Sequence, residues 1–161
     1  MTYQPPVRDF TFLLKDVLEI EKHANLPGFA DASMDTVEQI LDEAAKFTSE
    51  VLAPLNSVGD KHGCVWSPDN TVKTPPGFKE AYQQLVEAGW PGLGAAPDYG
   101  GQGLPHVVNL AFSEMSSSAN MAFSMYPGLT HGAYSALLNG GSDELKATYL
   151  PKLASGQWAA R

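Results

Sequence analysis

The stretch Gly89–Pro105 constrains the fold of this chain more than any other, because it holds six glycines and three prolines. Glycine loses much backbone entropy in regular structure and proline lacks an N–H donor, so neither a helix nor a central strand fits there. The stretch also carries Trp90, Leu93, Tyr99 and Leu104, large side chains that are stabilised by burial. We therefore predict an ordered, packed loop that joins two helices.

This loop does not have the spacing of a nucleotide-binding loop. Gly92 and Gly94 match the first two glycines of the dinucleotide fingerprint, but Pro97 occupies the position of the third. No Lys-Ser or Lys-Thr pair follows to form a phosphate-binding loop. The glycines are thus expected to serve the turn and its packing.

Composition narrows the class of protein. A chain of 161 residues with 43% hydrophobic residues can bury a core as one domain, and a formal net charge of −8 argues against nucleic acid as a partner. The single cysteine, Cys64, allows no internal disulfide, which fits a reducing compartment. Neither a membrane-spanning apolar run nor a secretory signal is present, so we expect a cytoplasmic protein with no membrane span.

Apolar residues recur at helical spacing along most of the chain, which predicts an all-α bundle of about five or six helices. Three of these helices have an expected N-terminal cap. The caps are a capping box formed by Asp35 and Glu38, then Thr74, and then Ser142. Prolines are expected to end or kink helices at Pro54 and to begin a turn at Pro151. The expected helical segments are about 10–24, 33–53, 74–88, 107–115, 119–139 and 142–150.

Between the second and third of these helices the helical pattern fades. Residues 65–72 have the composition of a short hairpin around the Pro68-Asp69-Asn70 turn. His62 and Cys64 form an H-x-C pair with no second pair nearby, and the remaining histidines are dispersed, so no metal site is predicted.

Two polar features interrupt the later apolar segments. Glu114 follows Leu110 and Ala111 on one helical face, where it is either a buried carboxylate acting as a general base or a structural carboxylate. The run Ser116-Ser117-Ser118 is expected to break the helical pattern, since hydroxyl groups compete for backbone hydrogen bonds.

The segment 119–139 is rich in methionine and aromatic residues and contains Pro127-Gly128. Either two helices meet at this dipeptide or one helix is kinked there. Its side chains are suited to lining an acyl pocket, and the same residue types also build ordinary cores.

Three motifs together carry a family resemblance. The Gly89–Pro105 pattern GW-x-GL-x-x-P-x-x-YGG-x-G-x-P, the segment Gly141–Lys146 and the segment Tyr149–Trp158 resemble the N-terminal α-helical domain of the acyl-CoA dehydrogenases. On this basis residues 31–161 are expected to form that domain, and residues 1–30 an N-terminal extension with one helix. The segment Leu26–Asp31 resembles the branch that includes 3-methylthiopropanoyl-CoA dehydrogenase.

The resemblance implies a flavin-dependent enzyme that oxidises an acyl-CoA thioester between Cα and Cβ. It further implies FAD as cofactor, electron-transfer flavoprotein as partner and a homo-oligomer. Family members hold the flavin in a β-domain and the catalytic base in a second helical domain, and neither is present in these 161 residues. We therefore expect no catalytic residue here, no tight binding of FAD by these residues alone, and no activity of the isolated chain.

By position within the resembling segment, five residues are expected to lie near the acyl group: Met125, Tyr126, Leu129, Thr130 and His131. His131 alone could equally be a hydrogen-bonded structural group. Two other functions remain open at this stage. One is a non-catalytic helical interaction module, and the other is a flavin monooxygenase or nitroalkane oxidase built on the same fold.

Overall fold

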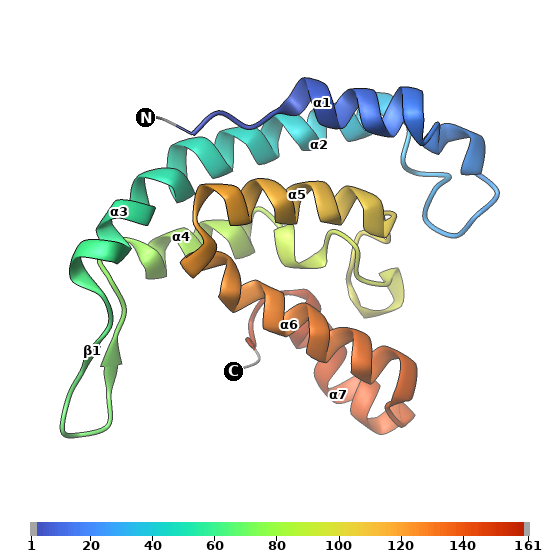
Figure 1. Ribbon diagram of the computed structural model, residues 1–161. Coiled ribbons are helices and arrows are strands. Elements are labelled where there is room, and N and C mark those ends of the chain that lie inside the picture. The colour runs from blue at the N-terminus through green and yellow to red at the C-terminus, as the bar shows by residue number, and fades with distance from the viewer. Residues whose placement is uncertain (1–2, 160–161) are drawn as a thin grey trace.

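The computed structural model describes residues 3–159, which form six helical rods and one small hairpin (Figure 1). This confirms the all-α prediction. The six rods are α1 (Val7–Phe12) with its π-helical continuation Leu13–Val17, the long rod of α2 (Met34–Lys46), a π-helical segment (Phe47–Leu52) and α3 (Ala53–His62), then α4 (Phe78–Glu87), α5 (His106–Ala119), α6 (Met121–Gly140) and α7 (Asp143–Ala154).

The first rod ends earlier than its apolar pattern predicts. Helical structure stops at Val17, Glu19 takes the left-handed backbone conformation with φ of 46°, and a single 3-10 turn follows over Ile20–His23. Phe10 is buried against α2, whereas Val17 is exposed to solvent. Only part of the predicted apolar face is therefore used for packing in this chain.

The second rod begins at the predicted place and continues past its proline. Its cap is Ser33 and not the predicted Asp35: the Ser33 hydroxyl accepts a hydrogen bond from the Thr36 N–H at 3.3 Å, and Asp35 lies in the first turn of α2. Pro54 was expected to end or kink the helix, and the structure instead carries the rod on to His62. Pro54 lies in the first turn of α3, directly after the π-helical segment, so its missing N–H falls where the hydrogen-bond register already changes.

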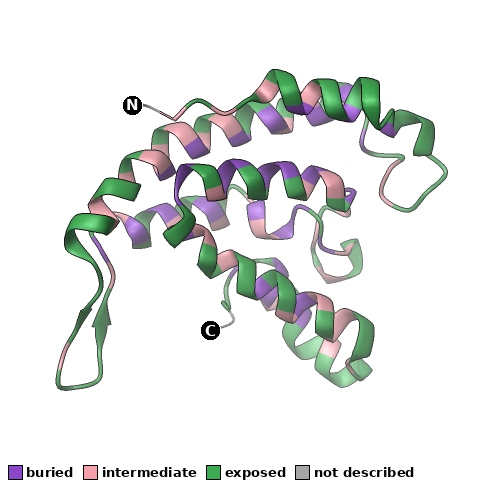
Figure 2. Cartoon of the chain, in the orientation of Figure 1, coloured by how far each residue is buried: buried purple, intermediate pink, exposed green. Residues whose placement is uncertain are grey.

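The predicted hairpin is confirmed. Strands β1 (Val65–Trp66) and β2 (Val72–Lys73) pair antiparallel, with Trp66 opposite Val72. The hairpin projects away from the helices, and its residues are coloured as exposed along most of its length (Figure 2). Thr74 does not cap the next helix: α4 starts after Gly77, whose φ of 84° favours glycine.

The last three helices correct two sequence expectations. The serines at 116–118 do not interrupt α5, which runs to Ala119. Of the two alternatives left open at Pro127-Gly128, the structure has one helix, α6, rather than a junction of two. The break between α5 and α6 falls at Asn120, which has an extended backbone. The Ser142 cap of α7 is confirmed, but α7 continues through Pro151 to Ala154 instead of turning there.

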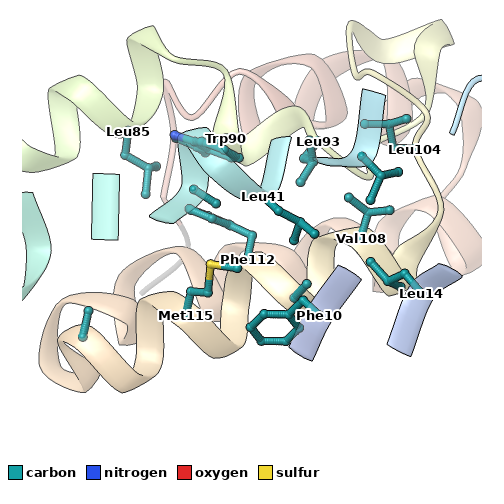
Figure 3. Close-up of a cluster of buried hydrophobic side chains, with 14 of the residues drawn as sticks. Phe10, Leu14, Leu41, Leu85, Trp90, Leu93, Leu104, Val108, Phe112 and Met115 are labelled. Atoms are coloured by element: carbon teal, nitrogen blue, oxygen red, sulfur yellow. The ribbon is translucent and has the colours of Figure 1, made fainter. Parts of the chain in front are cut away.

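The main core lies between α2, α4, α5 and the loop 89–105, and α1 closes it on one side (Figure 3). Trp90 of the loop stacks on Phe112 of α5 with ring centroids 4.3 Å apart and the planes 7° from parallel. Leu93 and Leu104 are buried beside them, which confirms the packed loop. Among residues 3–159, no helix has the length and apolar character needed to cross a membrane.

The glycines of the loop allow its two halves to lie against each other. The N–H groups of Gln102, Gly103 and Leu104 donate to the carbonyls of Gly92, Ala95 and Leu93 at 2.8, 2.9 and 3.1 Å. At Gly101, a β-carbon would lie only 2.0 Å from the Ala95 carbonyl oxygen. These hydrogen bonds hold the two halves of the loop together, so the loop has a fixed shape against which α6 and α7 pack.

Candidate functional site

A cavity of about 310 Å³ lies between α5, α6 and the loop 89–105. Its walls are largely apolar, and Leu85, Trp90, Phe112 and Phe123 contribute to them. Hydroxyl groups come from α5 and α6, and one histidine from each of these helices also lines the cavity. Mostly apolar walls with a few polar groups are typical of sites for small molecules, and this volume is at the small end of their range.

Of the five residues predicted to lie near a ligand, Thr130 and His131 line this cavity. Met125, Tyr126 and Leu129 are not among its lining residues and lie on the outer side of α6, where Met125 is 57% exposed and Leu129 is 54% exposed. The structure therefore divides the five between two faces of one helix.

His131 stands beside His106 of α5, with the two imidazole rings stacked at a centroid distance of 5.4 Å and 9° from parallel. Partial burial of the ring lowers the pKa of His131 below its ordinary value, and the nearby charge of His106 lowers that pKa further. Both effects disfavour the imidazolium form. At neutral pH His131 therefore contributes hydrogen-bonding nitrogen atoms rather than positive charge to the cavity wall.

Tyr134 ties α6 to the loop. Its side chain is buried, and its hydroxyl accepts a hydrogen bond of 2.9 Å from the backbone N–H of Ala96. Tyr134 and Ala95 both line the cavity, so this bond fixes the distance between two of its walls.

Ser116 of α5 was interpreted as part of a helix break, and the structure places it in the cavity wall. Its hydroxyl is buried and has no hydrogen-bond partner among the described residues. Ser113 and Ser117 also line the cavity, and the spacing 113, 116, 117 places three hydroxyls on one helical face. That spacing was the sequence signal that could have found them.

Glu114 is exposed on α5, so its interpretation as a buried general base is wrong. Cys64 is exposed near the base of the hairpin. Within residues 3–159, no cluster of three His, Cys, Asp or Glu side chains could hold a metal ion.

The described residues do not fit a flavin pyrophosphate. A cradle for that group needs free backbone N–H donors or clustered basic side chains. The N–H groups of Gln102, Gly103 and Leu104 are already bonded to carbonyls within the loop, and no basic side chain lines the cavity apart from the two histidines.

Comparison with known proteins identifies the class. Residues 34–157 match the family model described as acyl-CoA dehydrogenase, N-terminal domain. The chain therefore belongs to the acyl-CoA dehydrogenase family, as its loop and C-terminal motifs predicted. The match begins at Met34, where α2 starts. The division into residues 1–30 and 31–161 remains a prediction, and residues 1–2 and 160–161 of those ranges lie outside the described part.

The similar proteins are enzymes with much longer chains than this one. The chain is 40% identical over 99% of its length to 3-methylmercaptopropionyl-CoA dehydrogenase of Ruegeria pomeroyi, and 34% identical over 97% to a butyryl-CoA dehydrogenase of Syntrophomonas wolfei subsp. wolfei. It spans about a quarter of the length of these relatives, 27% and 26% respectively.

A chain in a solved structure has the same fold. It comes from a study of the electron transferring flavoprotein of Acidaminococcus fermentans, with a TM-score of 0.62 and 23% sequence identity. The similarity covers 76% of the present chain and 30% of that chain. At this identity the likeness supports the arrangement of helices and nothing more specific.

Proposed function

We propose that the protein containing this chain is an FAD-dependent acyl-CoA dehydrogenase, which introduces a double bond between Cα and Cβ of an acyl-CoA thioester. The observation that carries the proposal is the match of residues 34–157 to the N-terminal domain of that family. Because the relative that is 40% identical is named for 3-methylmercaptopropionyl-CoA, which is 3-methylthiopropanoyl-CoA, we take that thioester as the first substrate to test.

In this proposal the present domain supplies part of the wall around the acyl group. Phe123 and Trp90 offer apolar surface in the cavity, and such surface favours an acyl chain over water. His131 and Thr130 lie on the same wall. No residue of this chain is proposed as the catalytic base, since its one earlier candidate, Glu114, is exposed to solvent.

The proposal includes three partners for the complete protein. They are FAD as cofactor, electron-transfer flavoprotein as electron acceptor and further copies of the same chain in a homo-oligomer. A cytoplasmic location belongs to the same proposal. The flavin is assigned to parts of the protein other than residues 3–159, whose loop amides are already bonded to one another.

The experiment uses the full-length protein, purified with FAD and supplied with acyl-CoA substrates of increasing chain length and an artificial electron acceptor. Reduction of the acceptor that depends on acyl-CoA is the expected result. A flavin-loaded protein that oxidises none of these thioesters would contradict the proposal. The purified 161-residue chain, mixed with FAD and desalted, is expected to be colourless and inactive.

Variants of α6 decide which face of this helix contacts the acyl group. Phe123→Ala changes the cavity wall, and Leu129→Ala changes the outer face. If the cavity holds the acyl chain, Phe123→Ala should shift the ratio of kcat/KM toward longer substrates, since it enlarges the site. A shift with Leu129→Ala alone would place the acyl chain on the outer face, beside Met125 and Tyr126.

The exposed outer face of α6 supports a second candidate function, that of an interaction surface. Met121, Met125 and Leu129 lie one helical turn apart and are exposed, and α6 contains no Asp, Glu, Lys or Arg. Apolar stripes of this kind are usually covered by another protein surface. Under this candidate the domain binds a partner chain and the flavin-containing protein is inactive toward every acyl-CoA.

A further inference from the structure

The hydroxyl of Ser116 is chemically unusual in this fold. Ser116 is 5% exposed, and its Oγ is a buried polar side-chain atom without a hydrogen-bond partner among residues 3–159. A buried hydroxyl that makes no hydrogen bond loses the bonds it had with water, which destabilises the folded state. The chain therefore keeps this hydroxyl at a cost to its own stability.

Other hydroxyls in the helices of this chain avoid that cost. The side chains of Thr48 and Ser49 donate to the carbonyls of Ala44 and Ala45, four residues earlier, at 2.8 and 2.7 Å. Ser124, on the facing wall of the same cavity, donates to the Asn120 carbonyl at 3.1 Å. Ser116 could use the same bond within its own helix, and in this structure it does not.

The position of Ser116 indicates a role for its hydroxyl in binding a ligand. Ser116 belongs to the lining of the cavity, where Phe123 and Leu85 supply apolar surface. A rotation about the single side-chain torsion of serine is sufficient to turn its Oγ toward a bound molecule.

We propose that this cavity selects acyl groups that carry a hydrogen-bond-accepting heteroatom, and that Ser116 is the residue that recognises that atom. The inference rests on the proposed function, since it assumes that the cavity holds the acyl group. It adds a specificity-determining residue and a chemical class of acyl chain. A plain alkyl chain fills the same space but leaves the Ser116 hydroxyl unpaired, whereas an ether or thioether atom can accept a hydrogen bond from that hydroxyl.

The test uses two substrates that differ by one atom. In 3-methoxypropanoyl-CoA an ether oxygen replaces one methylene group of pentanoyl-CoA, so both acyl chains have the same length. The ratio of kcat/KM for the ether over the alkyl substrate is measured in the full-length wild-type protein and in Ser116→Ala. Because the intrinsic reactivity of each substrate is the same with both proteins, a change in the ratio reports the contact with residue 116.

We expect the ratio to fall about three- to tenfold in Ser116→Ala, which is the loss of one neutral hydrogen bond. Ser49→Ala is the matched control, because it removes a helical hydroxyl that is already bonded and lies outside the cavity. Its ratio should equal that of the wild type. An unchanged ratio in Ser116→Ala would overturn the inference, whether the hydroxyl is bonded to an ordered water or to nothing.

A second measurement does not depend on acyl-CoA. In the ligand-free protein, Ser116→Ala should raise the melting temperature, because it removes a buried hydroxyl with no partner, and Ser49→Ala should lower it. A fall in Ser116→Ala as large as that in Ser49→Ala would mean that Ser116 has a partner within the protein, and would overturn the inference. A wild-type protein that oxidises neither substrate would instead contradict the proposed function, and the inference with it.

Discussion

The hydroxyl of Tyr134 in α6 accepts a hydrogen bond of 2.9 Å from the backbone N–H of Ala96, in the glycine-rich loop. The two residues are far apart in sequence, and Tyr134 packs in a small core with Leu150 and Leu153 of α7. This bond adds to the packing of Ala95 in the loop against the same small core, so it helps to hold the helix pair α6 and α7 on the loop (Figure 1).

Tyr134→Phe should destabilise the protein by about 1–2 kcal/mol, because the ring is kept while the Ala96 N–H loses its acceptor. The free energy of unfolding in urea measures this loss. Tyr149→Phe is the control, since Tyr149 is an exposed residue of α7, and its free energy of unfolding should stay within about 0.5 kcal/mol of wild type. Equal effects of the two substitutions would show that the Tyr134 hydroxyl has no structural role.

The helical periodicity predicted most of the fold correctly where one side of a helix is buried and the other charged. In α2, Val37, Leu41 and Ala44 are buried at the predicted spacing. The prolines were less informative. Pro127 and Pro151 both lie inside helices, because packing of α6 against α5 and α7 holds the helical backbone where a donor is missing. A sequence rule for proline takes account of the missing N–H donor, but it does not take account of packing between helices.

The site was only partly predictable for a different reason. Since α6 has apolar residues on all sides and no charged residue, its sequence does not reveal which face turns inward. Tyr126 and Leu129 therefore looked as suitable as His131, and the structure places them on another face. The cavity wall also includes Ser116, whose buried hydroxyl has no hydrogen-bond partner among the described residues. This burial depends on how two helices pack together, so the order of residues along the chain does not reveal it.

Gly101→Ala should disrupt the loop. Its β-carbon would lie 2.0 Å from the Ala95 carbonyl oxygen and 2.3 Å from the carbonyl carbon, both backbone atoms that cannot move aside without opening the loop. We expect a loss of stability above about 3 kcal/mol, beyond the range of most single substitutions. Gly132→Ala in α6 is the matched control: among the described residues, no atom beyond the neighbouring backbone of α6 lies within 4 Å of the added β-carbon. The higher helix propensity of alanine should therefore stabilise the protein by about 0.5–1 kcal/mol. Thermal unfolding of both variants measures the difference in stability between them.

Asn120 makes two bonds at the junction of α5 and α6. Its side-chain oxygen accepts from the Phe123 N–H at 3.0 Å, and its amide donates to the Leu52 carbonyl at 3.2 Å. Asn120→Ala removes the cap and the side-chain hydrogen bond to the buried Leu52 carbonyl, so we expect a loss of about 2 kcal/mol in the free energy of unfolding. Ser142→Ala removes only an exposed cap, at the start of α7, and should cost about 1 kcal/mol. Similar losses in the two variants would contradict the role given to the Leu52 contact.

The lowered pKa of His131 predicts how stability depends on pH. Its folded-state pKa lies below the ordinary value of 6.5, because burial and the charge of His106 disfavour the protonated ring. The unfolded state therefore binds more protons than the folded state as pH falls through 6.5 and below. It follows that His131 adds a stabilising contribution that is present above that pH and is lost progressively as the solution becomes more acidic.

Urea unfolding between about pH 5 and 8 should therefore show stability rising with pH at the acidic end, and His131→Gln should reduce this slope. His106→Gln should raise the pKa of His131 in an NMR titration, because it removes one of the two causes of the shift. His62→Gln, at the exposed end of α3, is the control and should leave the slope unchanged. A slope that is the same in wild type and His131→Gln would mean that His131 titrates identically in the folded and unfolded chain, and would contradict the desolvation of His131 at the cavity.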